Sequence, residues 1–191
     1  MLFQFVQTVY WLALSVWFGG AMFIGLAVQK IHRTVRENNP ILPQVLSVNL
    51  EGQHSMLLAG SIIGELISSL ARIEIICAAI VLVMMGSQWF LIDLADPWTK
   101  SSEFVRCALG LAATGVVIYD GWFLWPRIIK ARQTFIDNAD DPDKANPVSE
   151  QLDRLQRDSE MLLMVQVFLL LGIILFSGNI HPPTFSFHTG D

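Results

Sequence analysis

The sequence predicts an all-α integral membrane protein, a four-helix bundle with an interfacial amphipathic helix before the second span. Hydrophobic residues make up 53% of its 191 residues and charged residues only 15%, whereas a soluble domain has about a quarter charged residues. The mean hydropathy is +0.50. Four long stretches carry almost no charge, and each is about long enough to cross a bilayer core of roughly 30 Å. We therefore expect one membrane domain that covers residues 1–191.

These stretches predict four membrane-spanning helices. The first has no charged side chain and is too long for the core of a signal peptide, so we expect it to remain as a helix. The third is followed by Pro126 and the fourth by Pro182 and Pro183, where proline cannot continue a helix. The predicted spans are residues 5–28, 75–92, 104–125 and 161–180.

The basic residues predict the orientation, because Lys and Arg are retained on the cytoplasmic side of a membrane. All but two of the 12 lie in the long segments 29–74 and 126–160, and Lys100 and Arg106 lie near the short link between the second and third spans. We therefore expect cytoplasmic loops at 29–74 and 126–160 and both termini outside the cytoplasm. A bacterial cytoplasmic membrane is the expected location.

The first long loop contains an amphipathic segment, residues 55–72. Its polar residues recur at spacings of four, three and four, which is the period of a helix with one polar face. We expect this helix to lie in the inner interface or to lead directly into the second span. In the second loop, an acidic turn at 137–143 precedes a predicted helix start at Asn146 and Pro147. The periodic polar residues of the amphipathic segment are Ser61, Glu65, Ser68 and Arg72.

Small residues predict where the helices pack, because close backbone approach favours helix association in lipid. Gly19 and Gly20 give the first span a small face, and Gly60 and Gly64 do the same for the amphipathic helix. The pair at 60 and 64 fits either packing within this chain or a contact between two copies of it.

One acid, Asp120, lies well inside a predicted span, and an ionised carboxylate in hydrocarbon costs several kcal/mol unless it is paired or hydrated. We therefore expect it to face protein, at the depth where the second span begins. A structural ion pair, most simply Asp120 with Arg72, is the favoured interpretation; a proton or ion pathway and simple snorkelling at the interface are the alternatives. The candidate inner-leaflet ionic cluster is Glu65, Arg72, Glu74, Asp120 and Arg127.

The histidines and cysteines do not predict a metal or haem site. No histidine lies in a predicted span, and Cys77 and Cys107 are separated by most of the bilayer. The sequence also lacks a nucleotide-binding loop, a nucleophile beside a base, and metalloprotease spacing. We therefore expect no enzyme activity and no cofactor. The net charge of −5 gives no basic excess for a nucleic acid.

Four segments together resemble the transmembrane protein 205-like family of four-helix membrane proteins. They are residues 14–23, 64–74, 119–128 and 152–159, and they extend over most of the chain. The resemblance implies a four-helix membrane domain without an assigned activity, and Gln156 stands where such proteins often carry histidine. A more distant similarity to copper-resistance membrane proteins of the CopD type rests on the stretch from Trp17 to Gly20, but it does not predict a metal site without a histidine in a span.

Three functional classes follow from these features. The preferred hypothesis is a scaffold or accessory subunit whose cytoplasmic segments contact a partner, either a second copy or another membrane protein. The second is an ion-coupled or small-solute transporter that uses the inner-leaflet cluster. The third is a haem or metal-binding redox protein, against which the missing histidines argue. In all three, the lipid bilayer surrounds the helices.

Overall fold

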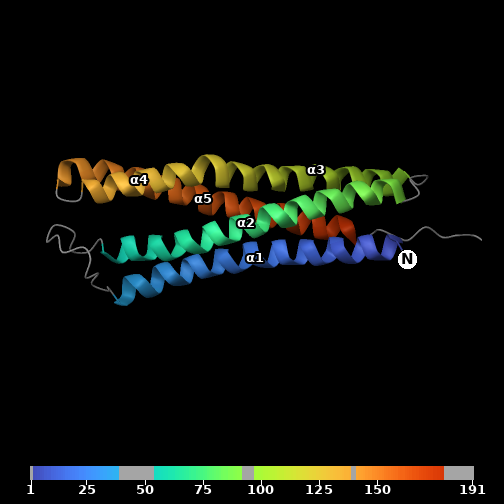
Figure 1. Ribbon diagram of the computed structural model, residues 1–191, viewed down its shortest axis with the longest axis horizontal. Coiled ribbons are helices and arrows are strands. Elements are labelled where there is room, and N and C mark those ends of the chain that lie inside the picture. The colour runs from blue at the N-terminus through green and yellow to red at the C-terminus, as the bar shows by residue number, and fades with distance from the viewer. Residues whose placement is uncertain (1, 39–53, 92–96, 139–140, 179–191) are drawn as a thin grey trace, which may run out of the picture.

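The computed structural model describes residues 2–38, 54–91, 97–138 and 141–178. All the elements in these ranges are helical, and α3, η2 and α4 follow one another as one long rod (Figure 1). The helix α1 pairs mainly with α2, whereas α3 and α4 pair with α5. The predicted all-α four-helix bundle is confirmed. The elements are α1 (Leu2–Asn38), α2 (His54–Leu91), α3 (Pro97–Tyr119), the π-helix η2 (Asp120–Leu124), α4 (Trp125–Asp137) and α5 (Pro142–Ser177).

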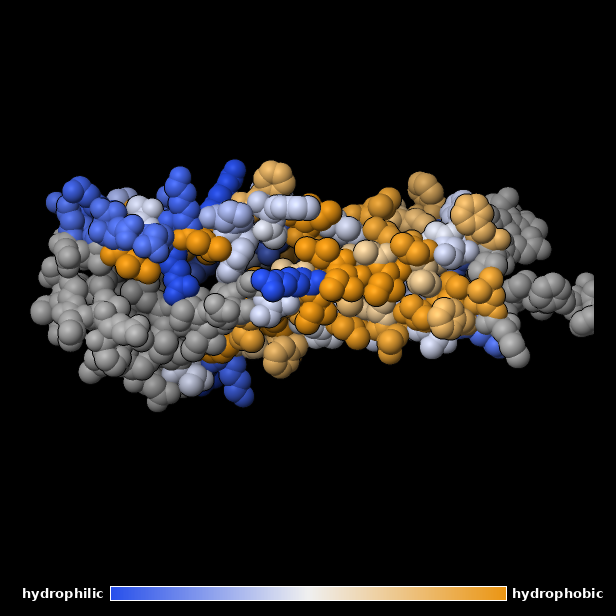
Figure 2. Space-filling model, in the orientation of Figure 1, coloured by the Kyte–Doolittle hydropathy of each residue, from blue (hydrophilic) through white to orange (hydrophobic). Residues whose placement is uncertain are grey.

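Four stretches of these helices are long and apolar enough to cross a membrane: Leu2–Val28, Ser69–Phe90, Ser101–Asp137 and Asp143–Ser177. Large apolar side chains cover their outer faces; Phe90 is 88% exposed and Trp122 and Phe168 are each 72% exposed. Figure 2 shows this apolar surface over much of the bundle, with hydrophilic side chains gathered near the end where α4 meets α5. Such a surface is suited to lipid rather than water, so the chain is an integral membrane protein.

The helices extend well beyond the predicted spans. The helix α1 continues to Asn38 and α2 begins at His54, so much of the predicted loop 29–74 is helical. The predicted amphipathic helix and second span form one helix of 38 residues, about 57 Å long. The length of an apolar run predicts only the part of a helix that lies in the membrane. The helix itself continues as long as its backbone hydrogen bonds do, so it can be longer than the predicted span. The side chains of residues 54–65 and Ser68 lie outside the described part, so the predicted polar face is not tested.

The helix that contains the third predicted span does not end before Pro126, because the rod continues through α4 to Asp137. The turn before Pro126 is π-helical, and the Trp125 N–H bonds to the Asp120 carbonyl five residues earlier. A proline ring collides with the carbonyl four residues before it in a regular α-helix. Here Pro126 occupies the first turn of α4, and the wider π turn lets the chain pass this proline without ending.

The helix α5 begins at Pro142 rather than at the predicted Asn146 and Pro147. Asp141 precedes it, and the Lys144 ammonium donates to the Asp141 carboxylate at 2.8 Å. This hydrogen bond lowers the pKa of the exposed Asp141 carboxyl. Pro142 suits the first turn of a helix, where its missing N–H costs nothing. The predicted loop 126–160 is therefore two helices joined by a short acidic turn.

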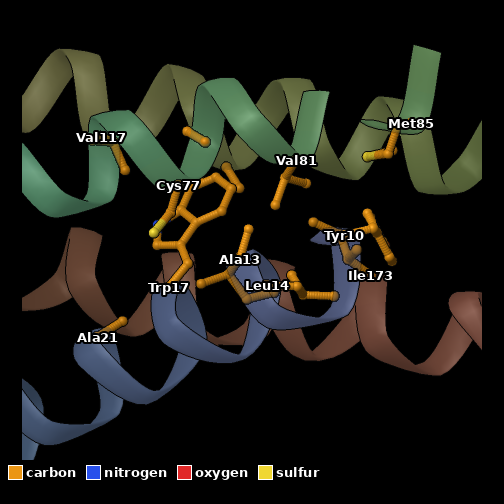
Figure 3. Close-up of a cluster of buried hydrophobic side chains, with 13 residues drawn as sticks. Tyr10, Ala13, Leu14, Trp17, Ala21, Cys77, Val81, Met85, Val117 and Ile173 are labelled. Carbon is orange, nitrogen blue, oxygen red and sulfur yellow. The ribbon is translucent and has the colours of Figure 1, made fainter. Parts of the chain in front are cut away.

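A hydrophobic core fills the middle of the bundle between α1, α2, α3 and α5. Trp17 of α1 lies beside Cys77 of α2 in its centre (Figure 3). Close helix approach also occurs at Gly20, where an added Cβ would lie 2.8 Å from Leu70 Cδ1, whereas one on Gly19 would meet nothing within 4 Å. Gly20 therefore lies where α1 approaches α2 closely, whereas Gly19 does not. Gly60 and Gly64 lie outside the residues whose side chains are described.

Candidate functional site

A partly enclosed cavity of about 100 Å³ lies between all the helices, in the half of the bundle that contains the α4–α5 turn. Most of its wall is apolar. Its polar side chains come chiefly from α5, which faces the acids of α2 and η2. The polar side chains that line the cavity are Glu74, Asp120, Arg132, Gln156, Ser159, Glu160 and Gln166. We call this site the carboxylate cavity.

Glu74 is the deepest acid of the carboxylate cavity. It lies on α2, and its side chain is only 7% exposed. The Gln166 Nε2 of α5 donates to Glu74 Oε1 at 2.8 Å, and Gln166 is itself buried. A neutral amide therefore binds this carboxyl group. An amide leaves the charge of a carboxylate uncompensated, so burial here carries a desolvation cost.

Asp120 is the second acid of the cavity and the first residue of η2. The Ser159 hydroxyl of α5 donates to Asp120 Oδ1 at 2.9 Å. A π turn adds one residue to the helical turn and changes the directions of the side chains around it; such turns are frequent at functional sites. In this chain the π turn coincides with the acid that lines the cavity.

The two acids lie at different depths. Their hydrogen-bond partners on α5, Ser159 and Gln166, are seven residues apart, which corresponds to about 10 Å along a helix. Asp120 is the nearer of the two to the α4–α5 turn, and Glu74 lies deeper in the bundle. They form two successive acidic positions along one cavity.

The structure brings together only part of the predicted inner-leaflet cluster. Glu74 and Asp120 line one cavity, whereas Arg72 and Arg127 are exposed. The predicted ion pair between Asp120 and Arg72 is wrong, because Asp120 bonds to Ser159 instead. Arg72 is two residues from Glu74, so the helix turns it to another face. The Glu65 side chain lies outside the described part.

The sequence prediction missed the side chains of α5 that bind the acids. Gln166 lies inside the predicted fourth span, and Ser159 lies two residues before it. Gln156, Ser159 and Gln166 follow spacings of three and seven, which place them on one helix face. A polar face that continues into an apolar span is the signal that would have indicated them.

A second buried polar group lies at the opposite end of the bundle, and it also escaped prediction. Arg106 of α3 is completely buried, although the sequence placed it near a link. Arg106 Nη2 donates to Glu103 Oε2 and to Gln88 Oε1, each at 2.6 Å. The Gln88 amide then donates to Gln7 Oε1 at 2.6 Å. This chain of bonds connects α3 with α2 and α1.

The same group also reaches α5. The Arg106 guanidinium lies over the Tyr10 ring, 5.1 Å from its centroid, and the Tyr10 and Ser177 hydroxyl groups are hydrogen-bonded at 2.6 Å. Arg106 Nε and Nη1 have no protein partner. The charge of Arg106 is nevertheless compensated by Glu103. We call this group the Arg106 cluster: Gln7, Tyr10, Gln88, Glu103, Arg106 and Ser177.

Within the described ranges, no group of three or more histidine, cysteine or acidic side chains is arranged to hold a metal ion. Comparison of the chain with protein-family models, with curated proteins and with solved structures gives no match. The geometry of the carboxylate cavity is therefore the basis on which we infer a function.

Proposed function

We propose that this protein is an ion-coupled carrier of a small solute, with the carboxylate cavity as its binding site and with Glu74 and Asp120 exchanging protons. One observation carries the proposal: two acids face a cavity inside the membrane-spanning helices, and each is bound by a neutral donor. Ionisable side chains inside a membrane protein are costly and typically mark ion or proton pathways. A purely structural acid would be expected to contact a cation.

The position of the cavity supports a carrier that is accessible from one side. The carboxylate cavity lies toward the α4–α5 turn, whereas the hydrophobic core and the Arg106 cluster fill the bundle beyond Glu74. From Glu74 to Gln88, α2 rises by 14 residues, or about 21 Å. A solute in the cavity would therefore need a helix movement to reach the opposite side, which is how carriers with alternating access work.

The proposed orientation places the cavity on the cytoplasmic side. A reporter inserted near Asp141 should be cytoplasmic and one fused after Asp191 extracytoplasmic, because most basic residues flank the α4–α5 turn or lie between the first two spans. The proposed membrane is a bacterial cytoplasmic membrane. The opposite labelling of the two reporters would reverse the direction in which the cavity opens.

A pH step on a proteoliposome layer tests the proposed function even while the solute is unidentified. Protons that enter the cavity and bind the acids move charge through the membrane, so the wild-type protein should give a transient current. The double variant Glu74→Gln with Asp120→Asn should give none. Glu150→Gln is the matched control, because Glu150 is 74% exposed and lies outside the cavity. Equal currents from the wild type and the double variant would overturn the proposal.

A scaffold or accessory subunit is the second candidate function. It is favoured by the polar end of the α4–α5 hairpin, where Arg154 and Glu150 are 79% and 74% exposed. Exposed charges of this kind can select a partner by electrostatic complementarity. The charge reversal Arg154→Glu should then release a protein that co-purifies with the wild type, while the pH-step current stays unchanged. Co-purification that is insensitive to Arg154→Glu would count against this surface.

A further inference from the structure

We infer that the solute of the carboxylate cavity is a small organic ammonium ion, with one positive charge and a short hydrocarbon body. This inference rests on the proposed function and names the chemical class that the same cavity would take. Three properties of the wall carry it: its charge, its apolar surface and its size.

The charge of the wall favours a cation. Three acids, Glu74, Asp120 and Glu160, line the cavity against one base, Arg132. Arg132 lies twelve residues beyond Asp120, or about 18 Å along the helix axis, toward the α4–α5 turn. Glu74 and Asp120 therefore lie deeper in the bundle than Arg132, and Glu74 is the buried one of these two acids. An ammonium group could donate hydrogen bonds to a carboxylate there, and such charged bonds are stronger than neutral ones.

The rest of the wall favours hydrocarbon over a hydrated metal ion. Apolar side chains from α1, α2, α3, α4 and α5 surround the acids, and Trp125 adds an aromatic ring that can bind a cation over its face. Inorganic cations such as Ca²⁺ instead need six to eight oxygen ligands at about 2.3–2.6 Å. The described residues contain no metal-holding group of three acids, histidines or cysteines. The apolar part of the wall includes Ile24, Val28, Leu70, Val117, Ile128 and Leu163.

The size of the cavity limits the solute. Its volume is about 100 Å³, which is smaller than the cavity of roughly 150 Å³ that holds benzene in an engineered protein. An alkylammonium ion of about five heavy atoms is therefore a suitable probe. We choose n-butylammonium, and its neutral counterpart 1-butanol has the same number of heavy atoms without the charge.

Calorimetric titration of the full-length protein in nanodiscs tests this inference. The wild type should bind n-butylammonium more tightly than 1-butanol and more tightly than Na⁺ or K⁺. Glu74→Gln should weaken n-butylammonium binding about tenfold or more, because a hydrogen bond to a charged group is lost. The same variant should change 1-butanol binding by less than about twofold, which distinguishes loss of charge from loss of the fold. Glu150→Gln should leave both titrations unchanged.

The outcomes separate the solute class from the proposed function. Tighter binding of Na⁺ or K⁺ than of n-butylammonium, or equal binding of n-butylammonium by the wild type and Glu74→Gln, would overturn the inferred solute class. If n-butylammonium binds as expected but the pH-step current is absent, the solute class stands and the ion-coupled function falls. If the current is present and n-butylammonium does not bind, the function stands and the solute class falls.

Discussion

The carboxylate cavity and the Arg106 cluster both place charged side chains inside the membrane-spanning bundle, but the acids of the two regions have different hydrogen-bond partners. Arg106 and Glu103 form an ion pair at 2.6 Å, with side chains 0% and 2% exposed. Glu74 and Asp120 instead bond to an amide and a hydroxyl group. The first arrangement is electrically neutral, whereas the second can gain a proton or a cation.

The two regions also differ in how they connect the helices. The Arg106 cluster links α1, α2, α3 and α5 by direct side-chain contacts. In the carboxylate cavity, the hydrogen bonds of Glu74 and Asp120 within the described residues go to α5, and the cavity lies beside both acids. Hydrogen bonds that join several helices restrict how those helices can pack. We therefore assign the structural role to the Arg106 cluster and the binding role to the carboxylate cavity.

The largest expected loss of stability comes from Arg106→Leu. It leaves Glu103 buried without a cation, and breaking one side of a buried ion pair typically costs about 3–5 kcal/mol. Thermal unfolding in detergent measures this loss. Arg106→Leu combined with Glu103→Leu should recover much of it, because both charges are then removed. A single variant that unfolds like the wild type would show that the Arg106 cluster is not the structural region.

An intermediate loss of stability is expected for a substitution at Gly20, where α1 passes Leu70 on the wall of the cavity. Gly20→Leu would collide with Leu70 and should destabilise the protein by roughly 1–3 kcal/mol. It should also push Leu70 toward the cavity and weaken n-butylammonium binding. Gly19→Leu is the matched control: a Cβ there meets nothing within 4 Å, so stability and binding should stay close to the wild type. Equal effects of both substitutions would contradict this packing.

The smallest stability effect is expected for Asp120→Asn. The asparagine carbonyl can still accept the Ser159 hydrogen bond, and no cation loses a partner. Stability in thermal unfolding should therefore change by less than about 1 kcal/mol. If Asp120 instead formed the ion pair with Arg72 that the sequence favoured, Asp120→Asn should lower the stability by more than this, and adding Arg72→Leu should recover the lost stability. Such a rescue would support the ion pair over the hydrogen bond to Ser159.

The sequence predicted the fold because membrane spans depend on a simple property, namely the length of an apolar run. The same property could not predict helix ends, since the helices continue beyond the apolar runs into more polar sequence. Pro126 was misinterpreted as a helix end for a related reason. The π turn that accommodates it depends on backbone geometry rather than on composition.

The candidate site was predicted in part. The sequence indicated Glu74 and Asp120 as members of one cluster, because acids near apolar runs are conspicuous, and both line one cavity in the structure. The sequence did not indicate the partners of these acids. Depth in the membrane alone cannot decide between Arg72 and Ser159, because the choice depends on the rotation of each helix about its axis. Arg106 was missed because the sequence prediction assigned this base to the link between the second and third spans. In the structure, Gln88, Glu103 and the ring of Tyr10 enclose Arg106 inside the bundle.

The most direct test of the proposed carrier function is to measure the pH-step current and the thermal stability of Glu74→Gln together. The glutamine removes the charge and retains the size of the side chain, and Gln166 can still donate to its carbonyl oxygen. We expect a protein that unfolds at or above the wild-type temperature and gives a reduced or absent current, while Glu150→Gln matches the wild type in both. A folded Glu74→Gln protein with the full wild-type current would contradict the central claim that this buried carboxyl group binds the transported charge.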